Sequence, residues 1–229
     1  MKAKALIFAL ALSAAVLAGQ GTFRLTRSFK VGDTDLYKLH STATMSMGDA
    51  DISMKIDQTV KKVYDNGEAD IESGMSDVHV MFNGSEVPAP ISTEKQTVHV
   101  DKKGMPTSLG KGGMGRLQFV RFASAFFDRD LKVGDTVPID LADPANPKSK
   151  VTGTCQVMSL ANGEAKIVAD LKITDPENAT PANLHLVSFF DVAASKPNRV
   201  EGDVTNMNVQ PDESAPPITA MKFVMERVK

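Results

Sequence analysis

The stretch Tyr37-Lys-Leu-His-Ser-Thr-Ala-Thr-Met-Ser-Met47 alternates its side chains with a period of two residues. One face carries tyrosine, leucine, alanine and methionine, and the other carries lysine, histidine and threonine. This period is typical of a β-strand with one buried and one wet face. Gly48-Asp49 predicts a turn, after which Ile52, Met54, Ile56 and Val60 alternate in the same way. The region therefore predicts a long antiparallel hairpin.

The same pattern continues along most of the chain. Asn66-Gly67 and Asn162-Gly163 are hairpin-turn signals, because both central positions of a type I′ turn need a positive φ. After the second of them, alternate positions from Ala165 to Ile173 are apolar. The fold is therefore predicted to be mainly β.

Two short sequences occur twice. Phe29-Lys-Val-Gly-Asp-Thr34 returns as Leu131-Lys-Val-Gly-Asp-Thr136, and Asn66-Gly-Glu-Ala69 returns as Asn162-Gly-Glu-Ala165. Both matches come in the same order at nearly the same offset, which indicates a duplicated unit. We expect two related antiparallel β-modules, 22–108 and 129–229, within one domain, 19–229. They are predicted to form one curled sheet or half-barrel; the alternative is two separate small sandwiches.

One segment departs from the period of two. Between 114 and 128 the apolar residues fall at helical spacing, which predicts an amphipathic helix between the modules. These residues are Leu117, Phe119, Val120, Phe122, Ala123, Phe126 and Phe127. The helix is expected to pack into the concave side of the sheet.

The first residues have the pattern of an export signal. Lys2 and Lys4 precede an apolar run from Ala5 to Leu17 that is too short to span a bilayer, and the pattern places cleavage after Ala18. Residues 1–18 are therefore predicted to be a signal peptide, with no stable membrane anchor left. Removing two of 26 basic residues leaves 24 against 28 acidic ones, a net charge of −4, which argues against nucleic acid as a partner.

The sequence contains few motifs that are typical of catalytic or metal-binding sites. The single cysteine, Cys155, is in phase with Val151 and Val157 and is interpreted as a buried apolar residue. The four histidines lack metal-ligand spacing and are expected on strand faces as polar partners. No pair of carboxylates sits on an apolar strand face, where burial would adapt one to acid–base work. We therefore expect no enzyme activity, no cofactor and no metal.

With the repeat and the apolar segment 114–128 identified, the chain resembles a group of uncharacterised exported bacterial proteins. Their marks are a β-module entered through a Val-Gly-Asp-Thr step and repeated once, and a late hairpin that here reads Phe190-Asp-Val-Ala-Ala-Ser195. Ser195 stands where glycine is usual in that group. The resemblance implies a fold and no activity. More distantly, the expected architecture is similar in outline to periplasmic lipoprotein-carrier half-barrels.

Two functions remain open at this point. The first is an exported binding protein, periplasmic or secreted, for an apolar small molecule, a lipid or a lipidated partner. Its expected pocket is lined by Met45, Met47, Met54, Phe119, Phe122 and Phe126, with the three methionines converging across the first hairpin. The second is a structural or protein-interaction module of the bacterial envelope without a small ligand, recognisable by an unpaired sheet edge or an exposed apolar patch.

Overall fold

The computed structural model describes residues 21–88, 94–107, 126–143, 146–174, 180–209 and 217–228. Within these ranges the chain is mainly β, and every strand pair is antiparallel. The strands are β1 (Phe23–Arg24), β2 (Thr34–Met45), β3 (Gly48–Val63), β4 (Ala69–Phe82), β5 (Ser85–Val87), β6 (Gln96–Val100), β7 (Asp130–Leu131), β8 (Thr136–Asp143), β9 (Asn146–Ala161), β10 (Glu164–Thr174), β11 (Ala182–Asp191), β12 (Lys196–Val209) and β13 (Ile218–Arg227).

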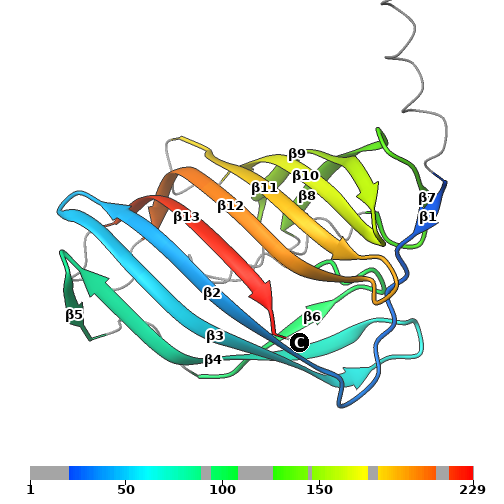
Figure 1. Ribbon diagram of the computed structural model, residues 1–229, viewed down its shortest axis with the longest axis horizontal. Helices are drawn as coiled ribbons and strands as arrows, with labels where there is room; N and C mark the ends of the chain where they lie inside the picture. The colour runs from blue at the N-terminus through cyan, green and yellow to red at the C-terminus, as the bar shows by residue number, and fades with distance from the viewer. Residues whose placement is uncertain are drawn as a thin grey trace, which may run out of the picture.

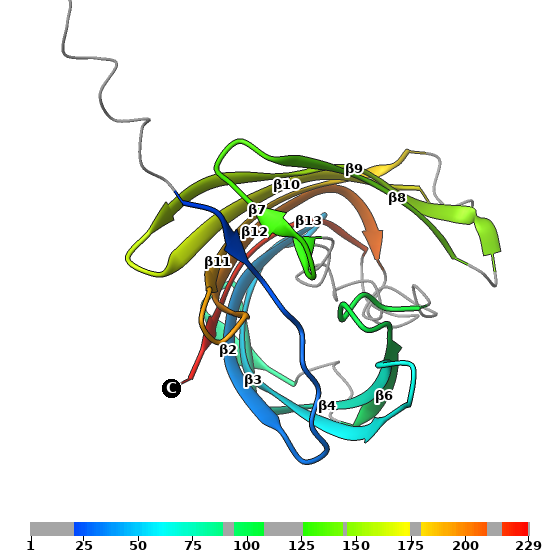
Figure 2. The ribbon, with the colours of Figure 1, turned by 90° about the vertical axis from the view of Figure 1, so that its right-hand side faces the viewer.

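Eleven strands form one sheet in the order β5-β4-β3-β2-β13-β12-β11-β10-β9-β8, with β6 also paired to β4 (Figure 1). The last strand, β13, pairs with β2, so the two halves of the chain lie in a single sheet. The sheet is open, with β8 at one edge and β5 and β6 at the other. Figure 2 shows that it curls, which leaves one concave and one convex face.

The helix expected at 114–128 is not borne out. Residues 108–125 lie outside the described ranges, and the described end, Phe126 to Asp128, is a turn with Asp128 at a φ of 62°. Phe126 and Phe127 are both buried. Apolar spacing indicates which residues are buried, and consecutive residues can be buried in a turn as well as in a helix. Among the described residues no helix is long and apolar enough to cross a membrane.

The two Val-Gly-Asp-Thr steps have the same local structure. In the first, Gly32 N donates to Val60 O at 2.9 Å and Val60 N donates to Asp33 O at 2.9 Å. In the second, Gly134 N donates to Val157 O at 2.8 Å and Val157 N donates to Asp135 O at 2.9 Å. Each glycine has a positive φ, 89° and 94°, which favours glycine at that point. The step thus fastens the start of one strand to its neighbour, and duplication of the halves stays a prediction.

The two Asn-Gly turns differ. Asn162 and Gly163 have φ of 52° and 77°, as a type I′ turn requires. Asn66 is instead part of a wider connection, in which Tyr64 N donates to Glu68 O and Gly67 N donates to Tyr64 O, both at 2.9 Å. The prediction of a type I′ turn at Asn66-Gly67 is wrong, because the loop between β3 and β4 contains three residues besides these two. The predicted signal peptide, 1–18, lies outside the described residues.

An N-terminal strap, residues 23–33, crosses one end of the curled sheet (Figure 2). It begins as β1, which pairs with β7. Thr26 N then donates to the hydroxyl of Ser195 at 3.0 Å, and Asp128 N donates to Leu25 O at 2.8 Å. Ser195 has a φ of 51°, which explains why glycine suits that position. The strap therefore ties distant turns to the body of the sheet.

Candidate functional site

The three methionines of the expected pocket do not converge. Met54 lies opposite Leu39, whereas Met45 lies opposite Gly48 at the hairpin end, six residues further along the strand. At about 3.3 Å per residue this is roughly 20 Å. Met54 is 7 % exposed and faces the core, and Met47 is 65 % exposed in the turn. The hairpin turn is too tight to bring Met54 beside Met45 or Met47.

The phenylalanines of the expected pocket are only partly described. Phe119 and Phe122 lie outside the described residues. Phe126 is fully buried in the main core cluster, together with Leu25 and Leu131. The ring of its neighbour Phe127 meets that of Phe190 edge-on, with centroids 5.9 Å apart. Phe126 is thus part of a packed core in this structure; ligand binding by any of the six residues stays a prediction.

The concave face is packed unevenly. Under β9, β10 and β11 most of its side chains are buried, as for Val157, Ile167 and Leu186. Under β2, β3 and β4 many inward apolar side chains keep part of their surface exposed. By register and burial these are Leu39, Ile52, Ile56, Met75, Val78 and Phe82. We call these six residues the apolar lining.

Cross-strand pairing of β2, β3 and β4 positions the apolar lining. Tyr37 pairs with Ile56, and Ile56 pairs with Met75, so the three stand in one row across β2, β3 and β4. A bulge at Asp77, with a φ of 50°, shifts the register between Met75 and Val78 and keeps both facing inward. Lys55 binds the Asp77 carboxylate at 2.6 Å on the convex side. The bulge therefore preserves an unbroken apolar face.

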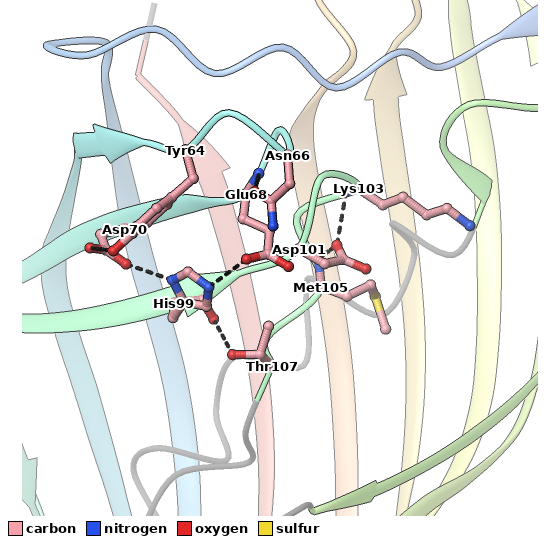
Figure 3. A network of polar contacts seen from close by, with 9 residues as sticks. All are labelled: Tyr64, Asn66, Glu68, Asp70, His99, Asp101, Lys103, Met105 and Thr107. Carbon is pink, nitrogen blue, oxygen red and sulfur yellow. Dashed lines mark hydrogen bonds and ion pairs between the residues drawn. The ribbon is translucent and has the colours of Figure 1, made fainter.

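A polar cluster stands where the β3–β4 loop meets β6 (Figure 3). His99 Nδ1 lies 2.7 Å from Asp70 Oδ1, and its Nε2 lies 3.1 Å from Glu68 Oε2. Tyr64 donates to the other Asp70 oxygen at 2.8 Å, and its ring meets the imidazole edge-on. Lys62 lies over the Tyr64 ring at 4.2 Å. We call Tyr64, Glu68, Asp70 and His99 the histidine clamp.

The clamp favours a charged imidazole. Carboxylates can only accept, so both ring nitrogens must donate. The hydrogen bonds that His99 donates to Asp70 and, with a smaller effect, to Glu68 raise its pKa. The pKa of Asp70 is lowered, chiefly by its bond to His99, and that of Glu68 is lowered by Asn66 and then His99. Because His99 lies in β6 and Asp70 in β4, the arrangement fits the fastening of β6 to β4.

The other histidines also lie in strands, as expected. His79 bonds to Glu86 at 2.8 Å, which joins β4 to β5, and His185 bonds to Asp170 at 2.6 Å, which joins β11 to β10. His40 and His185 border a shallow hollow on the convex face, which also includes Lys222 and Asp203. Among the described residues no group of three or more His, Cys, Asp or Glu side chains is placed to hold a metal ion.

Cys155 is buried on the concave face. Burial raises the pKa of its thiol to about 12, with a smaller contribution from Asp170. A thiol with that pKa carries almost no thiolate at neutral pH and is a poor nucleophile. The prediction that Cys155 is buried as an apolar residue is therefore confirmed.

Comparisons with known proteins give only weak likenesses. No known protein family and no curated protein matches the chain. Among solved structures, DynF from the dynemicin biosynthesis pathway of Micromonospora chersina is 11 % identical, with a TM-score of 0.24 over 91 % of this chain and 86 % of that one. A domain from Vibrio parahaemolyticus that has been proposed to belong to an outer membrane lipoprotein-sorting protein is 9 % identical, with a TM-score of 0.23 over 86 % of this chain and 83 % of that one. TM-scores this low establish neither a shared fold nor a shared function.

Proposed function

We propose that this chain is an exported, non-enzymatic binding protein of the bacterial envelope, and that its concave face under β2–β4 takes an apolar ligand or a lipidated partner. The observation that carries the proposal is the apolar lining, whose six inward side chains keep exposed surface while most of the same face under β9–β11 is buried. A face that only had to form a core would gain from covering both halves alike.

The physical chemistry of the lining suits an acyl chain. Leu39, Ile56 and Met75 offer branched and thioether surfaces that contact a ligand without fixed direction. Each methylene that a ligand transfers from water onto such a surface contributes about 0.8 kcal/mol. A chain of about ten carbons can therefore supply several kcal/mol before the ordering cost of binding is subtracted. Affinity would depend on the length of the chain.

A filling variant tests the proposal. Met75→Trp adds a large ring to the lining, and Leu36→Trp places the same ring on the convex face, where Leu36 is exposed. The probe is the neutral dye N-phenyl-1-naphthylamine, which fluoresces in apolar surroundings. We expect the wild-type protein and Leu36→Trp to bind it alike, and Met75→Trp to bind it about tenfold more weakly, a loss of about 1.4 kcal/mol. A folded wild-type protein that binds no dye, or equal binding by both variants, would refute the proposal.

A second function has its own observation. Strand β8 pairs only with β9, so its outer edge is unpaired within the described part of the chain. Such an edge can accept a strand from another protein, as an envelope-interaction module without a ligand would require. A photo-crosslinking residue in place of Ala142, which is exposed on β8, then captures one discrete partner in cells, and the same residue at Leu36 captures none. Equal capture from both positions would count against this alternative.

A further inference from the structure

An arginine occupies an inward position of the N-terminal strap. Leu25 is fully buried in the main core, and Phe29 packs against the small cluster of Val60, Ala69, Ile71 and Val100. Arg27 lies between them in the same alternation, while Thr26 and Ser28 are exposed. Two of the three inward positions of the strap are thus ordinary apolar anchors, and the third brings a guanidinium inward.

The guanidinium of Arg27 is under-satisfied. Its Cζ lies 4.9 Å from the centre of the Phe29 ring, and its buried Nε has no hydrogen-bond partner in the described part of the chain. Burial lowers the pKa of Arg27, and the nearby Tyr37 and then Asp35 partly offset that effect. Arginine stays charged in proteins even so, because its usual pKa is above 12. A charged group with an orphan donor in such a place calls for an explanation.

The carboxylate that interacts with Arg27, that of Asp35, is already engaged. Asp35 accepts a hydrogen bond from Lys196 Nζ at 2.8 Å, with side chains only 16 % and 28 % exposed. Two cations therefore face one anion at this end of the sheet. Arg227, the strand partner of Tyr37, has its own acidic neighbour, Asp191, at 3.6 Å. The positive charge of Arg27 is the one left without a paired carboxylate among these described groups.

This charge stands next to the apolar lining. Tyr37, which interacts with Arg27, is in the same cross-strand row as Ile56 and Met75. Leu39 is two residues beyond Tyr37 on the inward face of β2. The concave face thus presents a cation at the strap end and an apolar surface leading away from it.

We propose that the ligand is an amphiphile with one acyl chain and an anionic headgroup, which Arg27 binds while the chain lies on Leu39, Ile56 and Met75. The inference rests on the proposed function and specifies its ligand class. A guanidinium presents paired donors that match a carboxylate or a phosphate, and a partly buried site strengthens that hydrogen bonding. The headgroup pairs with the guanidinium, whose charge has no paired carboxylate among these groups, and the strap becomes part of the binding site.

Three ten-carbon probes test the proposal below their micelle-forming concentrations: decanoate, decyl phosphate and decan-1-ol. Binding is measured by calorimetry on the full mature chain. We expect both anions to bind the wild-type protein more tightly than the alcohol does, and Arg27→Gln to weaken the anions by about 10- to 100-fold while leaving decan-1-ol unchanged. The tighter of the two anions identifies a carboxylate or a phosphate headgroup.

Arg24→Gln is the matched control, because Arg24 lies on the same strap with an exposed side chain whose partners among the described residues are Asp130 and the Asp128 carbonyl. It should bind all three probes like the wild type. Arg27→Lys keeps the positive charge but lacks the planar guanidinium, so it should bind the anions with an affinity between those of the wild type and Arg27→Gln. It provides a second test if Arg27→Gln folds poorly. Equal binding of decanoate and decan-1-ol by the wild type, or no effect of Arg27→Gln on the anions, would overturn the headgroup assignment alone. Failure of the wild type to bind any of the three would overturn the proposed function with it.

Discussion

Gly202 offers a sharp test of how the concave face is built. It lies in β12 opposite Phe223 in β13, and the Phe223 ring covers the place where a side chain would begin. A β-carbon built at Gly202 would be 2.2 Å from Phe223 Cε1, 2.3 Å from Cζ and 2.9 Å from Cδ1. Carbon atoms pack best at about 3.5–4.0 Å, so the ring would have to move by more than about 1 Å.

Gly202→Ala should therefore destabilise the fold. Phe223 is itself buried, and forcing an extra methyl into a packed core typically costs about 1–3 kcal/mol. We expect a loss of about 2 kcal/mol in the free energy of unfolding, and a fall in melting temperature of roughly 4–8 °C for a domain of this size. Urea titration measures the loss, with an unchanged m-value because the surface exposed on unfolding stays the same.

Two further variants serve as controls for this measurement. Gly21→Ala is the control, because nothing lies within 4 Å of the β-carbon it would add. Phe223→Leu removes the ring, so Gly202→Ala should cost at least about 1 kcal/mol less in that background. An alanine at 202 that leaves stability unchanged, or that costs the same with and without the ring, would show that the glycine does not make room for Phe223.

Three further predictions concern the clamp, the thiol and the strap. Because the pKa of His99 is raised in the folded protein, its contribution to folding stability is complete below its unfolded pKa of about 6.5 and disappears as the pH rises through the folded pKa. His99→Gln should therefore reduce the free energy of unfolding more at pH 5.5 than at pH 8.5 in urea titrations. An equal reduction at both pH values would contradict the clamp. Cys155, with a thiol pKa of about 12, should resist iodoacetamide at pH 8 until urea unfolds the chain, and fast labelling of the folded protein would refute its burial. Leu25→Ala should cost about 2–5 kcal/mol, since Leu25 is fully buried, and a loss below about 1 kcal/mol by the same titration would show that the strap is not anchored.

Local patterns predicted the strands well. Ala165, Ile167, Ala169, Leu171 and Ile173 are all buried, in the period-two order that the sequence indicates. The Val-Gly-Asp-Thr steps and the Asn162-Gly163 turn also behave as their residue types require, because φ preferences act over a few residues and need no tertiary information.

Long-range placement was beyond the sequence. Nothing local states that β13 pairs with β2, or that β6 pairs with β4 and brings His99 to Asp70. The expected convergence of the three methionines was wrong for a related reason: Met45 and Met54 share a sheet face, but shared facing says nothing of distance along the strands. An inward arginine could have been predicted from the alternation of Leu25, Arg27 and Phe29, but three positions are too few to identify a strand pattern.

Native mass spectrometry of the mature protein, purified gently from the organism that makes it, shows whether the concave face carries a ligand. We expect a bound mass of lipid size on the wild type and on Leu36→Trp, and its loss from Met75→Trp, which fills the lining. The bare calculated mass for the wild type, together with no uptake of added decanoate or decan-1-ol, would contradict a ligand on the concave face.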